Sequence, residues 1–370
     1  MITVAVPGKL YIAGEYAVLE PGSAAVLTAV DRYVRVRLTP TRSIGPAVRT
    51  ITTDHARGRS IEFVHRGAGF EPVSAAEADT AGLSHVLAAL AMVDRYAAGS
   101  GQGPIAFALE IDSQLDDAET GRKYGLGSSG AVTVAAVRAA ARAYGLPLDA
   151  STELRLALLS VFSVDPHCSG GDVAASARGG WVYYRTPDRA ALISALARRD
   201  LDLGALLRQP WKHLAARSLP SPRELSLQVG WVGRPASSSA LVAAMKQAAR
   251  QHGSVYRQFV AASDRCVEQL ATACRAGDDR AIELALSAAG RLLRDLAAAS
   301  GVAIESRELS RLRCLAEELG AVAKSSGAGG GDCGIALIDP ARVPALRQRW
   351  RAGGIEPLNL RVPERKESIR

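Results

Sequence analysis

Alternation of polar and apolar residues predicts strands in the first half of the chain. Residues 2–6 are short and β-branched, and the Pro-Gly pair after them predicts a turn. Residues 31–38 alternate polar and apolar side chains, as in a strand with one face in water. Residues 105–111 and 181–184 predict two further strands. These segments together predict a sheet.

Apolar residues at helical spacing predict helices in both halves of the chain. The predicted helices cover residues 82–97, 131–144, 152–162, 239–252, 255–275, 279–299, 306–319 and 342–352. Three more strands are predicted at residues 225–232, 321–324 and 334–338. Helices and strands are mixed without strict alternation, which favours an α+β architecture.

A stretch rich in proline and charge divides the pattern. It covers residues 186–223, and we place the domain boundary inside it, giving domains of residues 1–205 and 206–370. The charged segment 363–370 is predicted to be a frayed tail.

Composition narrows the function classes. The 370 residues are 48% hydrophobic and 22% charged, an ordinary globular balance, and the formal net charge is +8. A basic protein can bind nucleic acid, acidic membranes or small anions. There is no dense Lys/Arg run with interleaved aromatic residues and no apolar stretch of about 20 residues, so we expect neither nucleic acid nor a membrane as partner. Five scattered cysteines and the absence of a signal-peptide pattern predict reduced thiols and a cytoplasmic location.

A glycine- and serine-rich segment leads directly into a predicted helix. Glycine lets the backbone approach a ligand closely, and the unpaired N–H groups of the first helical turn favour an anion. Two serine hydroxyls can bind phosphate oxygens or a magnesium ion. The Gly-Lys-Ser/Thr ending of a Walker A loop is missing. The alternative is a flexible loop capped by serine. We predict a phosphate-binding loop made of Gly125, Leu126, Gly127, Ser128, Ser129, Gly130 and Ala131.

Two other segments carry candidate chemistry. Residues 324–334 contain more glycines than a turn needs, which favours backbone packed against a ligand or another loop, although an ordinary hairpin connection is the alternative. Cys333 in this segment is predicted to be a packed residue, because no histidine lies nearby in sequence. In residues 7–18, Lys9 follows the Pro-Gly turn, where a cation could meet phosphates; alone, it would be a surface lysine.

In this order the three segments resemble the signature motifs of the GHMP kinase superfamily, over essentially the whole chain. The resemblance implies a two-domain α+β fold with a mixed-sheet N-terminal domain, a ferredoxin-like C-terminal domain and an active site between them. It also implies an ATP-dependent kinase that uses ATP and Mg²⁺. Details at residues 121–124, Glu15-Tyr16, residues 168–175 and Asp332 resemble the bacterial phosphomevalonate kinases in particular.

This branch implies ATP and 5-phosphomevalonate as substrates and 5-diphosphomevalonate, on the mevalonate route to isoprenoids, as product. One alternative is phosphorylation of a hydroxyl of mevalonate or another small hydroxy acid. Another is a ligand sensor without catalysis, although a sensor is expected to lose Lys9, Asp172 or the Ser128-Ser129 pair. The sequence leaves a monomer or a homodimer open.

The resemblance also implies residue roles. Lys9 and Asp172 are the catalytic residues, the loop at residues 125–131 binds ATP, and Ser129 is a magnesium ligand. Residues 237–239 resemble the substrate-side serines of the family, and the alternative is a plain helix N-cap. The implied substrate-binding residues are Lys9, Tyr16, Lys123, Ser169, Gly170, Asp172, Ser238, Ser326, Gly327 and Ala328.

Charge considerations refine two of these roles. A phosphate monoester has a second pKa of about 6, so the acceptor is already an oxyanion at neutral pH and needs little proton abstraction. The harder problem is repulsion between two anions, which we expect Lys9 and Lys123 to offset. Asp172 is then expected to hold Lys9 and orient the acceptor.

Two expectations concern residues around the site. Mevalonate kinases carry a magnesium-binding glutamate before the catalytic aspartate, whereas residues 158–162 here have no acid. Either Ser129, ATP and water suffice, or another acid such as Asp165 contributes. His167 could edge the site, and His85 is expected to be a packing residue or a hydrogen-bond partner.

Overall fold

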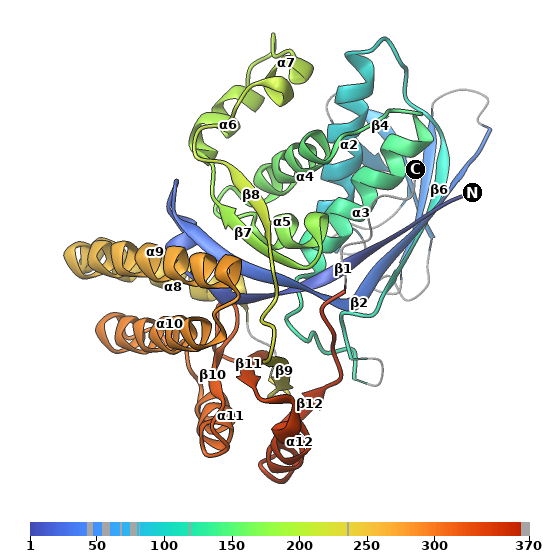
Figure 1. Ribbon diagram of the computed structural model, residues 1–370. Helices are drawn as coiled ribbons and strands as arrows, with labels where there is room; N and C mark the ends of the chain where they lie inside the picture. The colour runs from blue at the N-terminus through green and yellow to red at the C-terminus, as the bar shows by residue number, and fades with distance from the viewer. Residues whose placement is uncertain are drawn as a thin grey trace.

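A computed structural model describes residues 1–42, 47–53, 60–66, 69–74, 80, 82–117, 120–234 and 237–363 of the chain. Its two sheets lie one above the other in Figure 1, the first in the upper half and the second in the lower half. All but the first residue of the predicted tail lies outside the described residues.

The first sheet is mixed. Its strands run in the order β5-β4-β3-β6-β2-β7-β8, with β1 paired to β2 beside this path. The pairing of β3 with β6 is parallel, and the other pairings of this sheet are antiparallel. The bounds are β1 Ile2–Ala13, β2 Ala24–Pro40, β3 Val48–Thr53, β4 Ser60–Arg66, β5 Gly69–Pro72, β6 Phe107–Ser113, β7 Trp181–Arg185 and β8 Ala215–Leu219.

The turn predicted at Pro7-Gly8 is wrong. Strand β1 continues through it to Ala13, and the pairing with β2 shifts register between Pro7 and Gly8. A bulge bends the strand and does not end it, because pairing with the long strand β2 on both sides outweighs the local turn preference. Lys9 therefore lies inside a strand.

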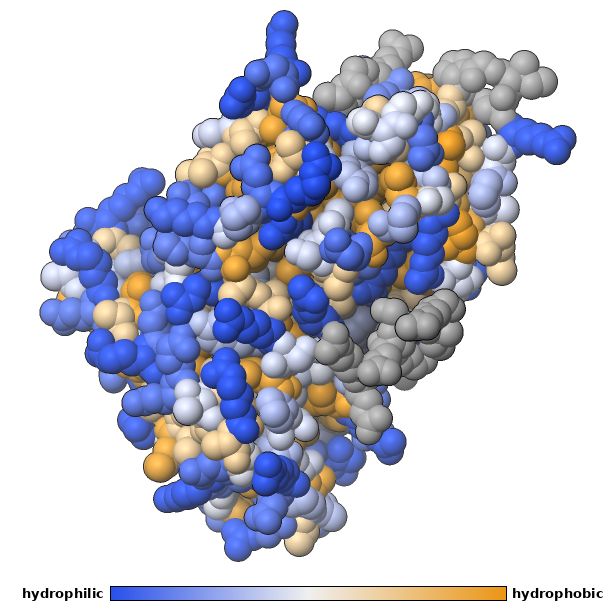
Figure 2. Space-filling view, turned by 45° about the horizontal axis from the view of Figure 1, so that its top comes forward, coloured by the Kyte–Doolittle hydropathy of each residue, from blue (hydrophilic) through white to orange (hydrophobic). Residues whose placement is uncertain are grey.

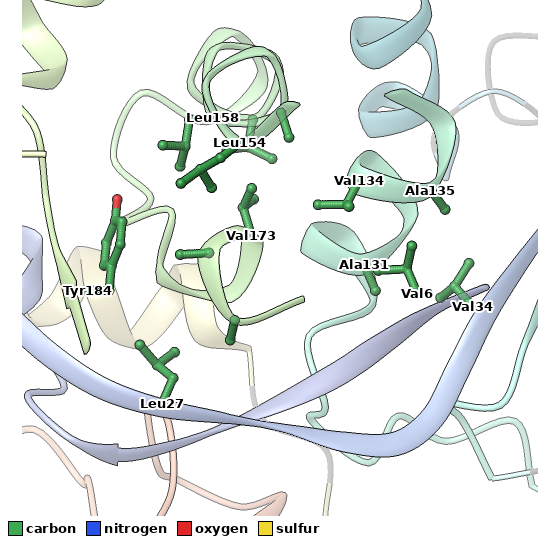
Figure 3. Packing of buried hydrophobic residues seen from close by; sticks show 14 of the residues in the cluster. Val6, Leu27, Val34, Ala131, Val134, Ala135, Leu154, Leu158, Val173 and Tyr184 are labelled. Atoms are coloured by element: carbon green, nitrogen blue, oxygen red, sulfur yellow. The ribbon is translucent and has the colours of Figure 1, made fainter. Parts of the chain in front are cut away.

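Helices pack on one face of this sheet. This packing fixes the positions of α3 and α5, whose first turns carry predicted site residues. Figure 3 shows Ala131 and Val134 of α3 (Ser128–Ala143) beside Val6 and Val34 of the sheet. In the same view Val173 of α5 (Gly171–Arg178) lies between Leu158 of α4 (Ala150–Val164) and Leu27 of β2. All of these apolar side chains are at most 1% exposed. Helix α2 (Ser84–Ala98) packs against α3 and α4.

The stretch predicted to separate the domains is more ordered than its composition suggests. It contains α6 (Arg189–Leu196), α7 (Leu203–Arg208) and strand β8. Because β8 pairs with β7, the first sheet extends past residue 205, and the second sheet begins with β9 at Ser226. The boundary at residue 205 stays a prediction.

The second sheet is antiparallel, in the order β10-β11-β9-β12. Helices α11 and α12 lie below this sheet in Figure 1, and α8, α9 and α10 lie above and to the left of it, with α10 against β10 and α9 against β2. The ferredoxin-like arrangement of this half stays a prediction. The bounds are β9 Ser226–Trp231, α8 Ser238–Gln251, α9 Gly253–Ala276, α10 Asp279–Ser300, α11 Arg307–Glu317, β10 Val322–Ser325, β11 Cys333–Ile338, α12 Val343–Ala352 and β12 Glu356–Leu358, with short 3₁₀ helices η1 Ala17–Leu19 and η3 Pro340–Arg342.

The surface carries both kinds of side chain. Figure 2 shows hydrophilic residues over most of one face, with smaller hydrophobic areas between them. In the described part of the chain, none of the helices has the length and hydropathy needed to cross a bilayer.

Candidate active site

Two adjoining cavities lie at the start of α3. The smaller has a volume of about 500 Å³ and lies between the two halves of the chain, since Lys9 and Asp172 line it from one side and Ala328 from the other. The larger, of about 1200 Å³, is lined mainly by residues of the first half. The residues that line both cavities are His85, Asp116, Lys123, Ser128 and Ser129.

The N-terminus of α3 stands at the boundary between these cavities. Its N-cap is Gly127, whose φ of +78° is left-handed, and no side chain caps it. The first helical hydrogen bond runs from the N–H of Ala131 to the carbonyl of Gly127 at 3.1 Å. Helix geometry leaves the three preceding amides without a partner inside the helix, and together with the helix dipole they favour an anion. The predicted phosphate-binding loop therefore has the geometry that phosphate binding needs.

Three glycines of this loop are each covered by one charged side chain. A Cβ added at any of them would come within 2.7 Å of that side chain, closer than real contacts allow. A side chain at any of these positions would therefore displace a charged side chain of the site. The pairs are Gly125 with Asp332, Gly127 with Lys9, and Gly130 with Asp172.

Lys9 is held from several directions. Its side chain is only 8% exposed, its ammonium group donates to the carbonyl of Gly125 at 3.1 Å, and its backbone N–H donates to the carbonyl of Leu126 at 2.8 Å. Burial lowers the pKa of Lys9, while the nearby carboxylates of Asp172 and Asp332 act in the opposite direction. The lysine therefore lies where its charge depends on the anions around it.

Asp172 lies in the first turn of α5 and lines the smaller cavity. Among the ion pairs of the described residues, none joins Asp172 to Lys9, but the carboxylate of Asp172 raises the pKa of Lys9, so the two charges interact. The expectation that Asp172 holds Lys9 in place stays a prediction. Lys123 is exposed and lines both cavities from the loop that leads to α3. The structure thus brings Lys9, Lys123 and Asp172 around one cleft.

Tyr11 is a site residue that the sequence reasoning missed. It lines the smaller cavity, and the Lys9 ammonium lies 5.5 Å from the centre of its ring. Its hydroxyl is 2.8 Å from the Oγ of Ser169, which also accepts the N–H of Gly171 at 3.1 Å. Burial raises the pKa of Tyr11, which keeps its hydroxyl protonated. Its place two residues beyond Lys9 in a strand, on the same face, was the available signal.

The glycine-rich segment of the second half closes the other side of the cavity. The hydroxyl of Ser326 donates to the carbonyl of Tyr11 and accepts its N–H, both at 2.9 Å. The hydroxyl of Tyr16 donates to the carbonyl of Ala328. The cavity is lined on this side by Ser326, Gly327 and Ala328. The hydroxyl of Ser326 is already hydrogen-bonded to the backbone of β1.

The remaining predicted residues divide into two groups. Ser169 and Ser238 line the smaller cavity, and Ser237 caps α8 by accepting the N–H of Ala240 at 3.3 Å. Gly170 is not one of the residues that line it: it is the left-handed N-cap of α5 and lies against Leu158. Gly130 and Ala131 are likewise not among the residues that line it.

The two histidines lie at the cavities. His85 is at the start of α2 and lines both of them, and its Nδ1 lies 3.5 Å from the hydroxyl of Ser84, in keeping with the expected role of a hydrogen-bond partner. Burial lowers the pKa of His85, against the influence of the carboxylates of Asp172 and Asp165. The helical pattern around residue 85 could not reveal that this turn meets α3. His167 lines the smaller cavity, as considered from the sequence.

Oxygen donors suited to magnesium lie at the boundary between the cavities. Ser129 and Asp116 line both, and Asp165 lines the smaller. Residues 158–162, which lack an acid, are buried in α4, and Asp165 is the C-cap of that helix. No cluster of three or more His, Cys, Asp or Glu side chains arranged for a metal occurs in the part of the chain that the structure describes. This donor set fits an ion that keeps waters and takes few protein ligands.

Comparison with known proteins gives consistent matches. Family models for the GHMP kinases N terminal domain and the GHMP kinases C terminal match residues 84–180 and 270–356. A phosphomevalonate kinase from Streptomyces sp. (strain CL190) is 40% identical over 96% of this chain and 95% of its own length.

Two solved structures share the fold over nearly the whole chain. The Lin0012 protein from Listeria innocua has a TM-score of 0.89 and 30% identity, covering 98% of each chain. The Streptococcus pneumoniae phosphomevalonate kinase in complex with phosphomevalonate and AMPPNP has a TM-score of 0.82 and 30% identity, covering 98% of this chain and 99% of that one.

Proposed function

The chain belongs to the GHMP kinase family, and we propose that it transfers the γ-phosphoryl group of ATP to the phosphate of 5-phosphomevalonate. The observation that carries the proposal is the meeting of two cavities at the start of α3. ATP takes the larger cavity with its phosphates at the start of α3, where Ser128 and Ser129 line both cavities, and the acceptor takes the smaller one. The similarity to phosphomevalonate kinases over nearly the full length supports this acceptor.

The reaction needs little proton transfer. An oxygen of the acceptor phosphate, ionised at neutral pH, attacks the γ-phosphorus, the bond from that phosphorus to the bridging oxygen of ATP breaks, and ADP leaves with the electron pair. The products are ADP and 5-diphosphomevalonate. The chain must therefore position two anions and reduce their repulsion.

The residues around the cleft supply these functions. Lys9 and Lys123 lie beside the smaller cavity and offset the negative charge of the two phosphate groups. Asp172 orients the acceptor from the first turn of α5. Ser129 would hold the magnesium ion of the nucleotide, either with water alone or with Asp165 as a second protein ligand. The ion would add positive charge at the phosphates.

The cytoplasmic location is part of this proposal. The five cysteines are scattered along the sequence, which favours reduced thiols and a reducing compartment.

The proposal is tested by the choice of acceptor. We expect ADP release, measured by a coupled assay, with ATP and 5-phosphomevalonate, and little release with mevalonate or homoserine at the same concentration. Phosphorus NMR should show a new diphosphate in the product. Turnover of mevalonate in place of 5-phosphomevalonate would establish the hydroxyl-phosphorylating alternative, and no turnover with any of the three would favour a sensor.

A further inference from the structure

Asp332 has a backbone conformation that normally belongs to glycine. Its φ is +54°, and Tyr16 and His213 are the other described non-glycine residues with positive φ. A Cβ in this region costs energy, which glycine avoids, although aspartate tolerates it better than most residues. A carboxylate at a strained backbone position points to a role for that side chain.

The side chain of Asp332 packs on the phosphate-binding loop. It occupies the space beside the Cα of Gly125, where an added Cβ would lie 2.7 Å from the carboxylate oxygen Oδ2. The carbonyl of the same glycine accepts the Lys9 ammonium at 3.1 Å. One residue of the loop is therefore contacted by both the carboxylate and the lysine.

The backbone around Asp332 is anchored in the second half of the chain. Its N–H donates to the carbonyl of Arg234 at 2.7 Å, and its carbonyl accepts the N–H of Val232 at 3.0 Å. The thiol of the next residue, Cys333, donates to the carbonyl of Tyr124 at 3.0 Å. Asp332 and Cys333 of the second half therefore contact two successive residues of the first half, Gly125 and Tyr124.

We propose that Asp332 is a positioning residue for phosphoryl transfer: anchored in the C-terminal half, its side chain fixes Gly125 of the phosphate-binding loop and, through it, the ammonium group of Lys9. This inference rests on the proposed function for its catalytic consequence. The contacts themselves are independent of which phosphate acceptor is used.

The charge of Asp332 adds to its packing. The charged and titratable groups that act on Lys9 are Asp172 from α5, Asp332 from the residue before β11, Cys333 from the first residue of β11, and Glu15 from the segment after β1. Removing Asp332 removes one of the groups that raise the pKa of Lys9, so burial lowers that pKa further. Lys9 then loses its proton at a lower pH than in the unchanged protein. Above that pH the site lacks this cation.

The central variant is Asp332→Gly, because glycine adopts this backbone without strain. We expect an unchanged or higher melting temperature and a kcat lower by about ten- to a hundred-fold, the loss typical of a slightly misplaced reacting group. The alkaline limb of the kcat profile should move to lower pH. Asp332→Asn, which keeps the shape and removes the charge, should show the same pH shift with a smaller loss of kcat. His213→Gly relieves left-handed backbone outside the site, and it should leave kcat and the alkaline limb of its pH profile unchanged.

A second measurement does not depend on the substrate. Competitive labelling of Lys9 with acetic anhydride, followed by mass spectrometry across pH, reports its protonation without turnover. Labelling should begin at lower pH in Asp332→Gly and Asp332→Asn than in the unchanged protein. Unaltered labelling in both variants, or an unaltered kcat in Asp332→Gly, overturns the inference. If the unchanged protein is inactive with 5-phosphomevalonate but the labelling shift occurs, the proposed function fails and the positioning of Lys9 by Asp332 stands.

Discussion

Asp172 lies against Gly130 with its carboxylate in the smaller cavity, and no ion pair among the described residues joins it to Lys9. For a kinase that phosphorylates a hydroxyl, a carboxylate in this position could serve as a general base. An acceptor phosphate is already ionised at neutral pH, so the base is not needed. The role left for Asp172 is to orient the acceptor and support the charge of Lys9.

This role predicts a mild effect of Asp172→Asn. We expect kcat to fall by less than about 100-fold, below the usual range for loss of a general base. The matched comparison is the same substitution in a family member that phosphorylates a hydroxyl, assayed by ADP release under the same conditions. Equal losses in the two enzymes would contradict the prediction.

At the scale of residues, sequence reasoning found those that belong to contiguous motifs. Lys9, the loop at residues 125–131 and Asp172 each lie in a short segment whose composition indicates phosphate chemistry. Tyr11 and His85 escaped because their importance comes from what other segments place beside them: Ser169 in one case and the start of α3 in the other.

At the scale of elements, the start of α3 depends on glycine for two separate reasons. Gly127 needs freedom of backbone, since its φ is +78°, and it needs space, since a Cβ would lie 2.7 Å from the Cε of Lys9. Gly145, just beyond the other end of the same helix, has a φ of +67° and nothing within 4 Å of an added Cβ. The two positions therefore separate backbone strain from displacement of the lysine.

We expect Gly127→Ala and Gly145→Ala to lose similar stability, about 1 kcal/mol each from left-handed strain. Only Gly127→Ala should lose activity, by about ten-fold or more, because Lys9 must move. Urea unfolding and ADP release measure the two effects. Equal activity of the two variants would mean that the contact between Gly127 and Lys9 has no part in turnover.

Long amphipathic or alanine-rich helices such as α3, α9 and α10 were predicted closely, because their periodicity extends over many residues. The errors have two sources, pairing partners that are remote in sequence and elements that are short. Strand β1 passes through Pro7-Gly8 because β2 pairs along both sides of the bulge. Strands β3, β4 and β5 and the helices α6 and α7 are short, so local pattern carries little information about them.

At the scale of the whole molecule, the two halves are joined by ion pairs of very different burial. Lys324 of β10 pairs with Glu15, which follows β1, and the two side chains are 1% and 2% exposed. Arg185 of β7 pairs with Glu268 of α9 at 2.6 Å, with side chains 36% and 47% exposed. The first pair lies beside the site, where Glu15 lines the smaller cavity and acts on Lys9.

Burial decides what the loss of one partner costs. A charge left alone in the interior has neither water nor a counter-charge, so removing one member of a buried pair destabilises a protein by about 3–5 kcal/mol. A half-exposed pair is screened by water and contributes about 0–1 kcal/mol. The two pairs are therefore a matched test of how the halves are held together.

We expect Lys324→Met to lower the free energy of unfolding by about 3 kcal/mol or more, because Glu15 is left buried without its cation. Arg185→Met should lower it by no more than about 1 kcal/mol. The double variant Lys324→Met/Glu15→Leu should recover much of the loss, since no charge then remains buried. Urea unfolding of the four proteins measures these differences. If Lys324→Met costs no more than Arg185→Met, the buried pair is not what holds the second half against the site.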